Sequence, residues 1–533
     1  MQRRNFIKNA TAGVVLPTLL QGFGVKVSAE PQLPLLLPPT ETDKVLVVIQ
    51  LDGGNDGLNM AIPADQYGQL LALRPNIVHP ESEYLSLNNT PNIRLNPQMT
   101  GIQSLYNEER IAIVQAVGYN NHSSSHPTGT QHMLNGAMQA GEYISTGIFG
   151  RYLHHPNEYP DYPDLLPDDP IALEFGDYAS LLLQDSNASL SVLMNNAQSF
   201  CNLYWGTSNN DIGCDLNEPI PDIDLNAGKA KGKLTYIRQL TKLSSHYANR
   251  LKQAFDLGAM VGVGNTDPDI NFACNPYNLH ELTRQLYIIA RLIKGGLNTR
   301  MYVVKLSGFD LHGNQQYGHS QLLGWLSTAI KRFMDDITTM GIDHRVIGMT
   351  VSEFGRTIKQ NGSQGTDHAT SSVMLLFGTP IVGGVYGTNP ILPPLSAFAN
   401  PATFDASNNI ARQFDIRSIY STILNSWFCT PAAQLNDIVQ PNALNNNLEA
   451  IPLLPVIANS PCCVGMPAPI ITGSTNACIN GSYTYSVPLV AGATYQWTVQ
   501  GGTIVAGQGT NAVQIMWNAG VVGTLNVEQT NQQ

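Results

Sequence analysis

The sequence predicts an α/β fold, a mostly parallel sheet flanked by helices, followed by a small C-terminal β-sandwich. Apolar runs typical of buried strands alternate with stretches of helical spacing, which is the order expected for parallel strands joined by crossover helices. Three of these runs each lead into an acidic residue: 45–51 into Asp52, 301–306 into Asp310, and 346–351 into Glu353.

The remaining elements of the large domain follow from the same patterns. One more buried strand is expected at 111–116, and helices are expected at 128–138, 234–257, 279–294, 321–340 and 415–428. Two segments, 156–224 and 388–409, are rich in Pro, Asp, Asn and Ser, so we expect long surface loops there.

Acidic and histidine side chains at these strand ends indicate a divalent-metal site. The carboxyl ends of parallel strands meet along one edge of a sheet, where ligands bind. His312 follows Asp310 by two residues, and Asp367 stands directly before His368 after a glycine-rich loop. Carboxylate oxygens and imidazole nitrogens together are typical metal ligands. The predicted ligands are Asp52, Asp310, His312, Glu353, Asp367 and His368, and the predicted cofactor is one or more ions of Zn, Mg, Ca or Mn.

The composition changes after a proline-rich linker at 451–465. Beyond it, short alternating runs at 482–487, 494–499, 513–517 and 523–527 are separated by Gly, Ser and Asn, as in small antiparallel sandwiches. The predicted domains are therefore 40–450 for the α/β domain and 466–533 for the β-module. The last strands of the module are reached only at the end of the sequence, so we expect the natural chain to continue past Gln533.

The N-terminus has the pattern of an export signal. Arg3 and Arg4 precede a weakly apolar stretch and a small-residue cleavage pattern, so residues 1–29 are predicted to be a twin-arginine signal peptide. We expect a periplasmic, cell-surface or extracellular protein, with cell-surface attachment as one option and no integral membrane segment, because no other run is long enough to span a bilayer. The seven cysteines predict disulfides in that compartment, with Cys201–Cys214 as a candidate pair.

The charge of the chain limits its partners. The net charge is -11 among 533 residues, which argues against nucleic-acid binding through phosphate neutralisation. An anionic substrate would need a local metal ion or arginine. Arg356 lies three residues after Glu353 and is the candidate for holding such an anion, although a structural ion pair fits it equally well.

Ser125 is the candidate nucleophile. It follows the strand expected at 111–116 and precedes His126, Pro127 and a helical stretch, so its hydroxyl would lie at a helix N-terminus, where anions are favoured. A helix cap followed by proline explains the same residues without catalysis. Both roles are compatible, because a capping serine that faces a metal ion is also placed for attack.

Several of these motifs resemble an exported bacterial family called domain of unknown function 1501, which is grouped with the alkaline phosphatase and sulfatase superfamily. The resemblance spans about residues 40–430. The C-terminal residues resemble PKD-like and Ig-like modules of secreted bacterial proteins. The motifs that carry the family resemblance are the Asp-Gly-Gly-Asn-Asp-Gly turn after Leu51, Gly-Phe-Asp-Leu-His at 308–312, Ser-Glu-Phe-Gly-Arg at 352–356 and Gly-Thr-Asp-His at 365–368.

The resemblance implies an alkaline-phosphatase-like fold, one or two divalent ions, and displacement at a tetrahedral ester centre by a hydroxyl or modified residue. It places Asp52, Asp310, His312, Glu353 and His368 at metal-ligand positions and Ser125 in the nucleophile region. The superfamily usually shows Asp-His where this chain has Glu353-Phe354, and Ala369 stands where the family usually has glycine. One imidazole is therefore lost from the expected set.

Two functions from different classes follow. The first is an exported metal-dependent hydrolase of phosphate or sulfate esters, whose partner is an anionic ester, with glycan-linked esters as one class. The second is a non-catalytic surface binding protein on a phosphatase-like scaffold. A carbohydrate sulfatase or esterase is a weaker third hypothesis, because the chain lacks the Cys-x-Pro-x-Arg pattern that sulfatases modify.

Overall fold

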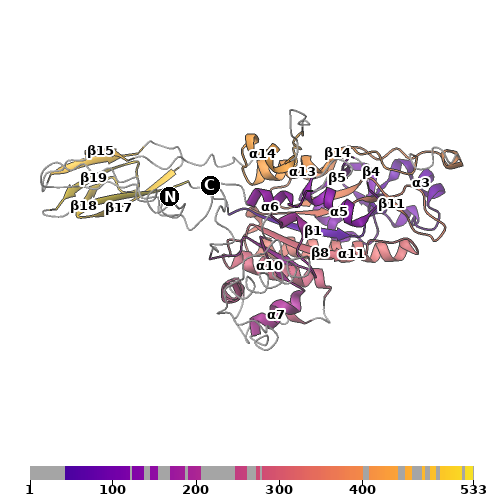
Figure 1. Cartoon of the computed structure of the whole chain (residues 1–533), viewed down its shortest axis with the longest axis horizontal. Coiled ribbons are helices and arrows are strands. Elements are labelled where there is room, and N and C mark those ends of the chain that lie inside the picture. Colours follow the sequence, from indigo (N-terminus) through magenta and orange to yellow (C-terminus); the bar gives the residue numbers. More distant parts are fainter. Residues whose placement is uncertain are drawn as a thin grey trace, which may run out of the picture. The chain divides into compact units, whose positions relative to one another are not determined.

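The chain divides into two compact units, one spanning Thr40–Cys462 and the other including Cys463–Gln533. Figure 1 shows the secondary structure of each unit in a computed structural model. The predicted signal peptide lies outside the described residues. The structure describes residues 43–120, 123–136, 144–153, 168–185, 190–205, 247–260, 272–275, 279–399, 407–441, 451–458, 471–474, 481–487, 493–518 and 523–531.

A nine-stranded sheet forms the centre of the first unit. Strand β12 runs antiparallel to its neighbours β5 and β9, and the other pairings are parallel. The predicted α/β class, with a mostly parallel sheet, is confirmed. The order is β13 (Gly384–Tyr386), β5 (Ile111–Gly118), β12 (Ser372–Phe377), β9 (Val346–Val351), β1 (Val45–Asp52), β8 (Met301–Ser307), β6 (Ala172–Phe175) and β7 (Ser191–Met194), with β14 (Phe414–Asp415) beside β5.

The four strands predicted from apolar runs are all present, as β1, β5, β8 and β9. Nearly every residue of these strands is buried, which is the reason that their sequences are continuously apolar rather than alternating. Because β12 is antiparallel to both β5 and β9, these two strands point the same way. The carboxyl ends of β5, β9, β1, β8 and β6 therefore lie along one edge of the sheet.

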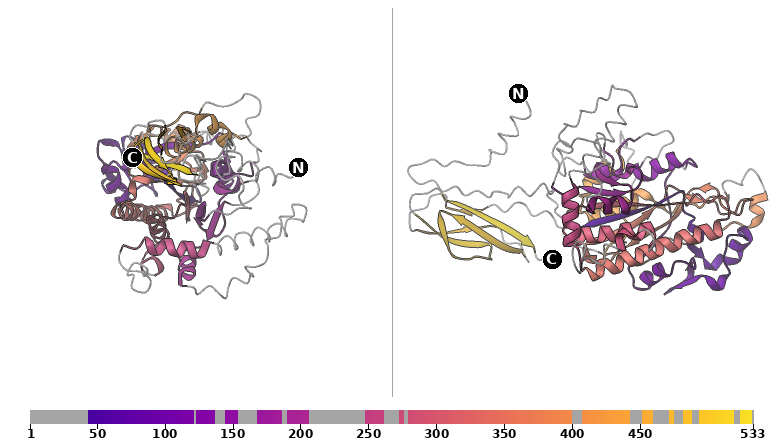
Figure 2. Two further views of the ribbon diagram at one scale, coloured as in Figure 1. Left: turned by 90° about the vertical axis from the view of Figure 1, so that its left-hand side faces the viewer. Right: turned by 90° about the horizontal axis from the view of Figure 1, so that it is seen from below.

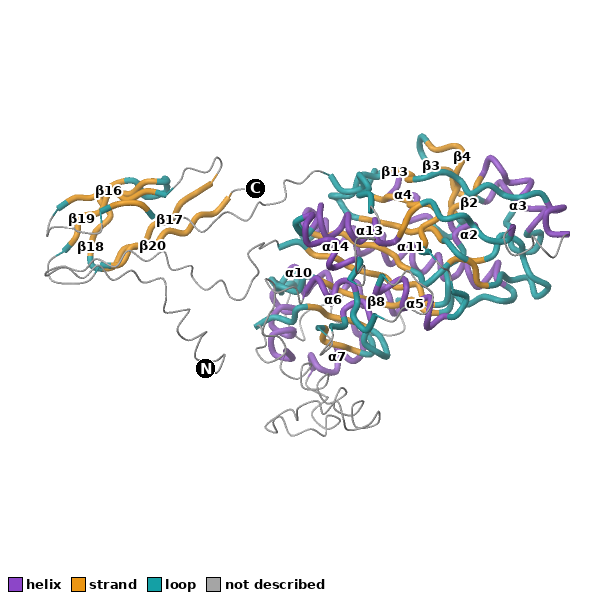
Figure 3. Tube along the Cα trace, turned by 45° about the horizontal axis from the view of Figure 1, so that its top comes forward, coloured by secondary structure: helices purple, strands orange, loops and turns teal. Residues whose placement is uncertain are grey.

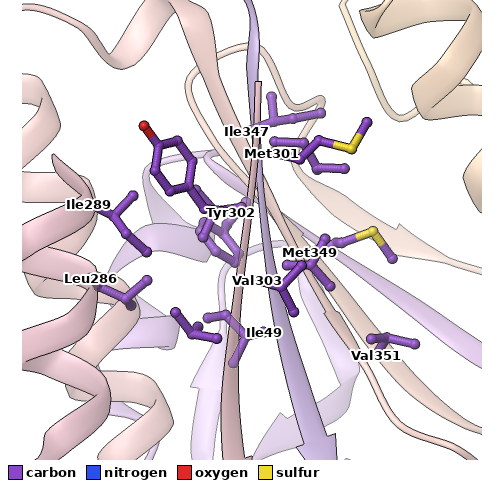
Figure 4. Packing of buried hydrophobic residues seen from close by; sticks show 14 of the residues in the cluster. Ile49, Leu286, Ile289, Met301, Tyr302, Val303, Ile347, Met349 and Val351 are labelled. Atoms are coloured by element: carbon purple, nitrogen blue, oxygen red, sulfur yellow. The ribbon is translucent and has the colours of Figure 1, made fainter. Parts of the chain in front are cut away.

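Helices cover the sheet, as Figures 1 and 3 show. The helix predicted at 279–294 is confirmed as α10, and α11 packs beside it, as the right-hand view of Figure 2 shows. Leu286 and Ile289 of α10 face Tyr302 and Ile49, whereas Met349 lies on the opposite side of the strands (Figure 4). The helices are α4 (Thr100–Asn107), α5 (His126–Asn135), α6 (Ile148–Leu153), α7 (Ala197–Trp205), α10 (Glu281–Lys294), α11 (Gln315–Thr339), α13 (Ile416–Thr422), continued by a π-helical turn (Ile423–Trp427), and α14 (Ala432–Val439).

Several helix boundaries differ from the prediction by a few residues. Helix α11 begins at Gln315, six residues before the predicted start, because Asn314 adopts a left-handed conformation that separates it from the preceding loop. Helix α5 begins at His126 rather than at 128 and has Pro127 in its first turn. Of the helix predicted at 234–257, only the part from Tyr247 onward lies within the described residues, and it is helical to Leu257.

The prediction of a long loop at 156–224 was wrong in part. Strands β6 and β7 and helix α7 lie within it, and both strands belong to the central sheet. Each strand has only four residues, which is too short for a periodic pattern to stand out from the polar sequence around it. The candidate pair Cys201–Cys214 was also wrong, because Cys201 forms a disulfide with Cys274 across 73 residues.

Smaller elements surround the sheet edge. Strand β10 (Gly355–Arg356) pairs antiparallel with β11 (His368–Ala369), so Arg356 and His368 are register partners. A three-stranded sheet of β2 (Ala61–Pro63), β4 (Thr90–Leu95) and β3 (Leu85–Leu87) follows α2 (Gly57–Met60) and flanks α3 (Tyr67–Leu73). No helix among the described residues is both long and apolar enough to cross a membrane.

The second unit is antiparallel, as predicted. Its buried core includes Tyr485, Trp497, Ile515 and Trp517, and the indole of Trp517 donates to the Tyr485 hydroxyl at 2.9 Å. One sheet has the order β15 (Thr472–Gly473), β16 (Ser482–Ser486), β19 (Ala512–Trp517) and β18 (Gly502–Ala506), and the other pairs β17 (Ala493–Gln500) with β20 (Thr524–Asn531).

Candidate metal centre

The loops that follow β1, β8 and β9 meet at the edge of the sheet. The amide of Phe309 donates to the carbonyl oxygen of Asp52 at 3.1 Å, and the amide of Gly53 donates to Glu353 Oε1 at 2.8 Å. The backbone thus brings the three predicted acidic positions together. Gly53 is required at this contact, because its φ is 121° and a Cβ atom there would lie 2.3 Å from the amide nitrogen of Asp310.

The Asp310 carboxylate is the centre of the arrangement. Its Oδ1 atom lies 3.0 Å from Nε2 of both His312 and His368, and its Oδ2 atom lies 3.3 Å from Nε2 of His126. Ligand atoms of His126, Asp310 and His368 all lie within 4.8 Å of one another, and within the described residues this is the one group of three that could hold a metal ion. Three imidazoles, from the start of α5, the loop after β8 and strand β11, therefore converge on one carboxylate.

The other nitrogen of each imidazole is held by an acceptor. Nδ1 of His368 lies 2.7 Å from the carbonyl oxygen of Ser124, which can only accept, so this Nδ1 carries the hydrogen. Nδ1 of His312 lies 3.0 Å from Asp367 Oδ1. With one hydrogen on each ring, at Nδ1, His312 and His368 direct the lone pairs of their Nε2 atoms inward, where these two atoms are 3.0 Å apart.

His126 is fixed in the same way. Its Nδ1 lies 2.9 Å from Oε1 of Glu353, whose side chain is almost fully buried. The ring also packs on Phe354, with 5.1 Å between ring centroids. A carboxylate or carbonyl acceptor on Nδ1 is the usual partner of a histidine that ligates metal through Nε2. Three lone pairs directed at one carboxylate repel one another unless a proton or a cation lies among them.

The two aspartates of the cluster are held in their ionised form. Burial alone would raise the pKa of Asp310, but the hydrogen bond from Arg356 and the charge of Arg356 outweigh it and hold this pKa far below its usual range. Burial likewise opposes ionisation of Asp367, whose pKa is nevertheless lowered by hydrogen bonds from Asn361 and His312. Both carboxylates are therefore negatively charged near neutral pH.

Arg356 is buried beneath the cluster, with 1% of its side chain exposed. Nε donates to the carbonyl oxygen of Gly54 at 2.9 Å, and Nη1 donates to that of Thr366 at 3.0 Å. Nη2 donates to Asp310 Oδ1 at 2.6 Å, to the carbonyl oxygen of Phe309 at 3.1 Å and to that of Gly53. All three guanidinium nitrogens are thus bonded within the protein, so they are not directed at an open anion site.

Two predicted site residues lie at the margin of the cluster. Asp52 accepts a hydrogen bond from the Ser307 hydroxyl at 3.3 Å, and its carboxylate is not part of the three-residue group. Ser125 is exposed at the start of α5, directly before His126, and its side chain makes no capping bond. His126 was not among the ligands predicted from the sequence. The available signal was a histidine just past a strand end, the pattern that identified His312.

A buried polar network supports the loops of the candidate metal centre. Arg74 and Asp56 form an ion pair of 2.8 Å with side chains about 1% and 2% exposed. Gln315 donates to Asp56 and accepts from the Thr366 hydroxyl at 2.6 Å. The network connects the turn after β1 to the residue before Asp367, so it fixes the two loops relative to each other.

Glu174 on β6 is a buried carboxyl group that should make stability depend on pH. Burial raises its pKa to about 7, against opposing hydrogen bonds from Ser191 and Ser180 and the charge of Lys305. A carboxyl group with a raised folded-state pKa contributes its stability below the unfolded pKa and loses it as the pH rises through about 7. Between pH 5 and pH 8, Glu174→Gln should therefore gain stability relative to the parent protein, by about 3 kcal/mol at most.

Urea unfolding of both proteins across this pH range measures the difference. The exposed substitution Glu108→Gln is the control and should leave the pH profile unchanged. Parallel profiles for Glu174→Gln and the parent would show that Glu174 does not titrate in this range.

Two segments of the chain match family models. Residues 273–434 match the family model described as "Protein of unknown function (DUF1501)", and residues 465–533 match the model described as "PKD-like domain". The resemblances inferred from the motifs are confirmed for these segments. The first match includes Asp310, His312, Glu353 and His368, whereas His126 lies outside it. No curated protein matches the chain.

Several solved structures are similar in arrangement at low sequence identity. PsFucS1 sulfatase from Pseudoalteromonas sp. is 8% identical, with 91% of this chain and 84% of that chain covered and a TM-score of 0.32. A protein in the alkaline phosphatase superfamily from Vibrio parahaemolyticus is 10% identical over 73% and 67% of the two chains, with a TM-score of 0.29. The lipoteichoic acid synthase LtaP from Listeria monocytogenes is 9% identical over 69% and 70%, with a TM-score of 0.27. These scores are too low for equivalent residues to be assigned.

Proposed function

We propose that this protein is a metal-dependent hydrolase of phosphate or sulfate esters. The observation that carries the proposal is the convergence of three imidazole Nε2 atoms on the Asp310 carboxylate, each ring held at Nδ1 by an acceptor. The proposed ligands are His126, Asp310, His312 and His368. Glu353 and Asp367, predicted as ligands, are proposed instead to orient His126 and His312 through their Nδ1 atoms.

The donor set favours zinc among the predicted ions. Three nitrogen donors and one carboxylate oxygen suit Zn²⁺, and imidazole also binds other late first-row metals. Mg²⁺ and Ca²⁺ prefer sites made almost entirely of oxygen. We therefore propose Zn²⁺ as the resident ion, with Mn²⁺ as the competitor that elemental analysis would distinguish.

Different residues of the chain would have different roles in ester hydrolysis. A bound Zn²⁺ supplies Lewis acidity that offsets the negative charge developing on the ester oxygens. Ser125 remains the proposed nucleophile, because it is exposed and directly precedes His126. Arg356 would hold Asp310 and the surrounding carbonyl oxygens in place rather than contact the ester.

One observation favours the non-catalytic alternative. Phe354 is fully buried and packs against His126 and His368, with ring centroids 5.1 and 4.6 Å apart. It stands where the superfamily usually has a histidine, so a second ion would lack that ligand. A binding protein could keep the single remaining ion for recognition of an anionic ester or glycan.

Elemental analysis of the exported protein tests the proposal. We expect about one equivalent of Zn²⁺ per chain, hydrolysis of 4-nitrophenyl phosphate or 4-nitrophenyl sulfate, and loss of that activity on treatment with a chelator and its return with Zn²⁺. A folded protein without stoichiometric metal would contradict the metal centre. Bound metal without hydrolysis of either ester would favour the binding protein.

The organisation and location of the chain are proposed with this function. We propose a twin-arginine signal at 1–29, an α/β domain at 40–450, a linker at 451–465 and a β-module at 466–533. The proposed location is the periplasm, the cell surface or the extracellular space. An oxidising compartment would also support the Cys201–Cys274 disulfide.

A further inference from the structure

The loop after β6 carries an exposed aromatic side chain to the same sheet edge as the metal centre. Tyr178 lies three residues beyond the end of β6 and is 56% exposed. Strand β6 pairs with β8, which ends just before Asp310, and β8 pairs with β1, which ends at Asp52. The tyrosine therefore stands beside the strand ends that form the candidate centre.

Lys305 of β8 holds this tyrosine in place. Its ammonium group donates to the carbonyl oxygen of Tyr178 at 2.9 Å and lies 3.4 Å from the centroid of the tyrosine ring. The lysine stem passes close to Gly176, where a Cβ atom would lie 3.1 Å from Lys305 Cδ. A ring that is held in this way loses little conformational freedom when it binds a ligand.

Three carboxylates act electrostatically on the ring. Burial raises the pKa of Tyr178, and the negative charges of Asp52, Glu353 and Asp177 raise it further, so the phenol stays protonated and lies within electrostatic reach of all three. Asp177 is exposed, and the Asp52 carboxylate is partly open beside Ser307. The rim thus offers one flat apolar face together with several hydrogen-bond acceptors.

We propose that Tyr178 stacks against a pyranose ring, and that Asp52 and Asp177 accept hydrogen bonds from its hydroxyl groups. A sugar combines a flat C–H face with hydroxyl donors, and both match this rim. An aryl group would use the ring but leave the carboxylates without donors, and an anionic group placed beside Asp52 and Asp177, away from the proposed ion, would be repelled by them. The inference deepens the proposed function, since it makes the substrate a sugar ester, but the stacking itself does not depend on hydrolysis.

Saturation-transfer NMR of the purified full chain, loaded with Zn²⁺, tests the proposal. The probes are the methyl glycosides of glucose, galactose, mannose and fucose, in their pyranose forms. At least one should bind the parent protein, Tyr178→Phe should retain its affinity within about twofold, and Tyr178→Leu should weaken it by about fivefold or more. The Phe variant is the matched control, because it keeps the ring and removes only the hydroxyl group.

Two results would overturn the proposal: no binding of any of the four glycosides to the parent protein, or equal binding by the Leu variant. The circular dichroism and zinc content of each variant show that the fold and the centre are intact. Hydrolysis of 4-nitrophenyl phosphate and sulfate is measured separately on the same samples. If hydrolysis is absent but sugar binding is retained, the hydrolase proposal is contradicted and the sugar-binding proposal is supported.

Discussion

Replacing His126 with alanine should lower the affinity for Zn²⁺ by about 100-fold or more, with a matching loss of ester hydrolysis at limiting metal. Removing an acceptor that only orients a metal-bound histidine costs about 10-fold to 100-fold, so removing the ligand itself should cost at least the upper value. The ring bridges two carboxylates, with Nδ1 2.9 Å from Glu353 and Nε2 3.3 Å from Asp310. Isothermal titration of the metal-free protein with Zn²⁺ measures the change.

The controls separate ligation from general loss of structure. Glu353→Gln keeps an acceptor oxygen for Nδ1 but removes the charge, so it should fall between the parent protein and His126→Ala in affinity. His79→Ala removes a partly buried histidine that contacts Ser320 and Glu83 outside the cluster, and it should leave zinc binding unchanged. Equal zinc affinity in His126→Ala and the parent would remove His126 from the centre.

The main elements of the fold could be predicted because each has a clear hydrophobic pattern in its own short stretch of sequence. The strands that precede Asp310 and Glu353 are buried on both faces, so they appear as unbroken apolar runs. Strands β6 and β7 could not be predicted, because four residues are too few to show a periodic pattern of apolar and polar side chains. Their place in the sheet depends on pairing with β8 and with each other rather than on their own sequences.

Some residues of the candidate site could likewise be predicted from local sequence, and others could not. Asp310 and His368 could be predicted because each stands in a short motif with the residue types that ligate metals. His126 could not be predicted as a ligand, because a histidine at the start of a helix does not by itself indicate metal binding. The partner of each imidazole Nδ1 depends on the three-dimensional approach of distant loops, as with Ser124 and His368, which are 244 residues apart.

The position of Arg356 leads to the second large expected effect. Arg356→Met should destabilise the fold by about 3 kcal/mol or more, because each buried carbonyl oxygen left without its donor costs about 1–3 kcal/mol. The substitution leaves the carbonyl oxygens of Gly54 and Thr366 without the guanidinium that satisfies them. Urea unfolding measures the loss, and Arg94→Met, which removes an exposed pair with Glu81, should cost less than about 1 kcal/mol.

The same variant distinguishes the two roles considered for Arg356. An arginine that holds a substrate anion would leave stability nearly unchanged on substitution and would raise KM. An arginine that positions Asp310 would lower stability and zinc affinity together, because Asp310 Oδ1 loses the 2.6 Å bond that orients it and its pKa moves back toward the ordinary range. Arg356→Lys should rescue little of either property, since one ammonium group cannot reproduce a planar fork that reaches carbonyl oxygens on three loops. Normal stability and zinc affinity with a raised KM in Arg356→Met would therefore restore the anion-binding role and contradict the positioning role.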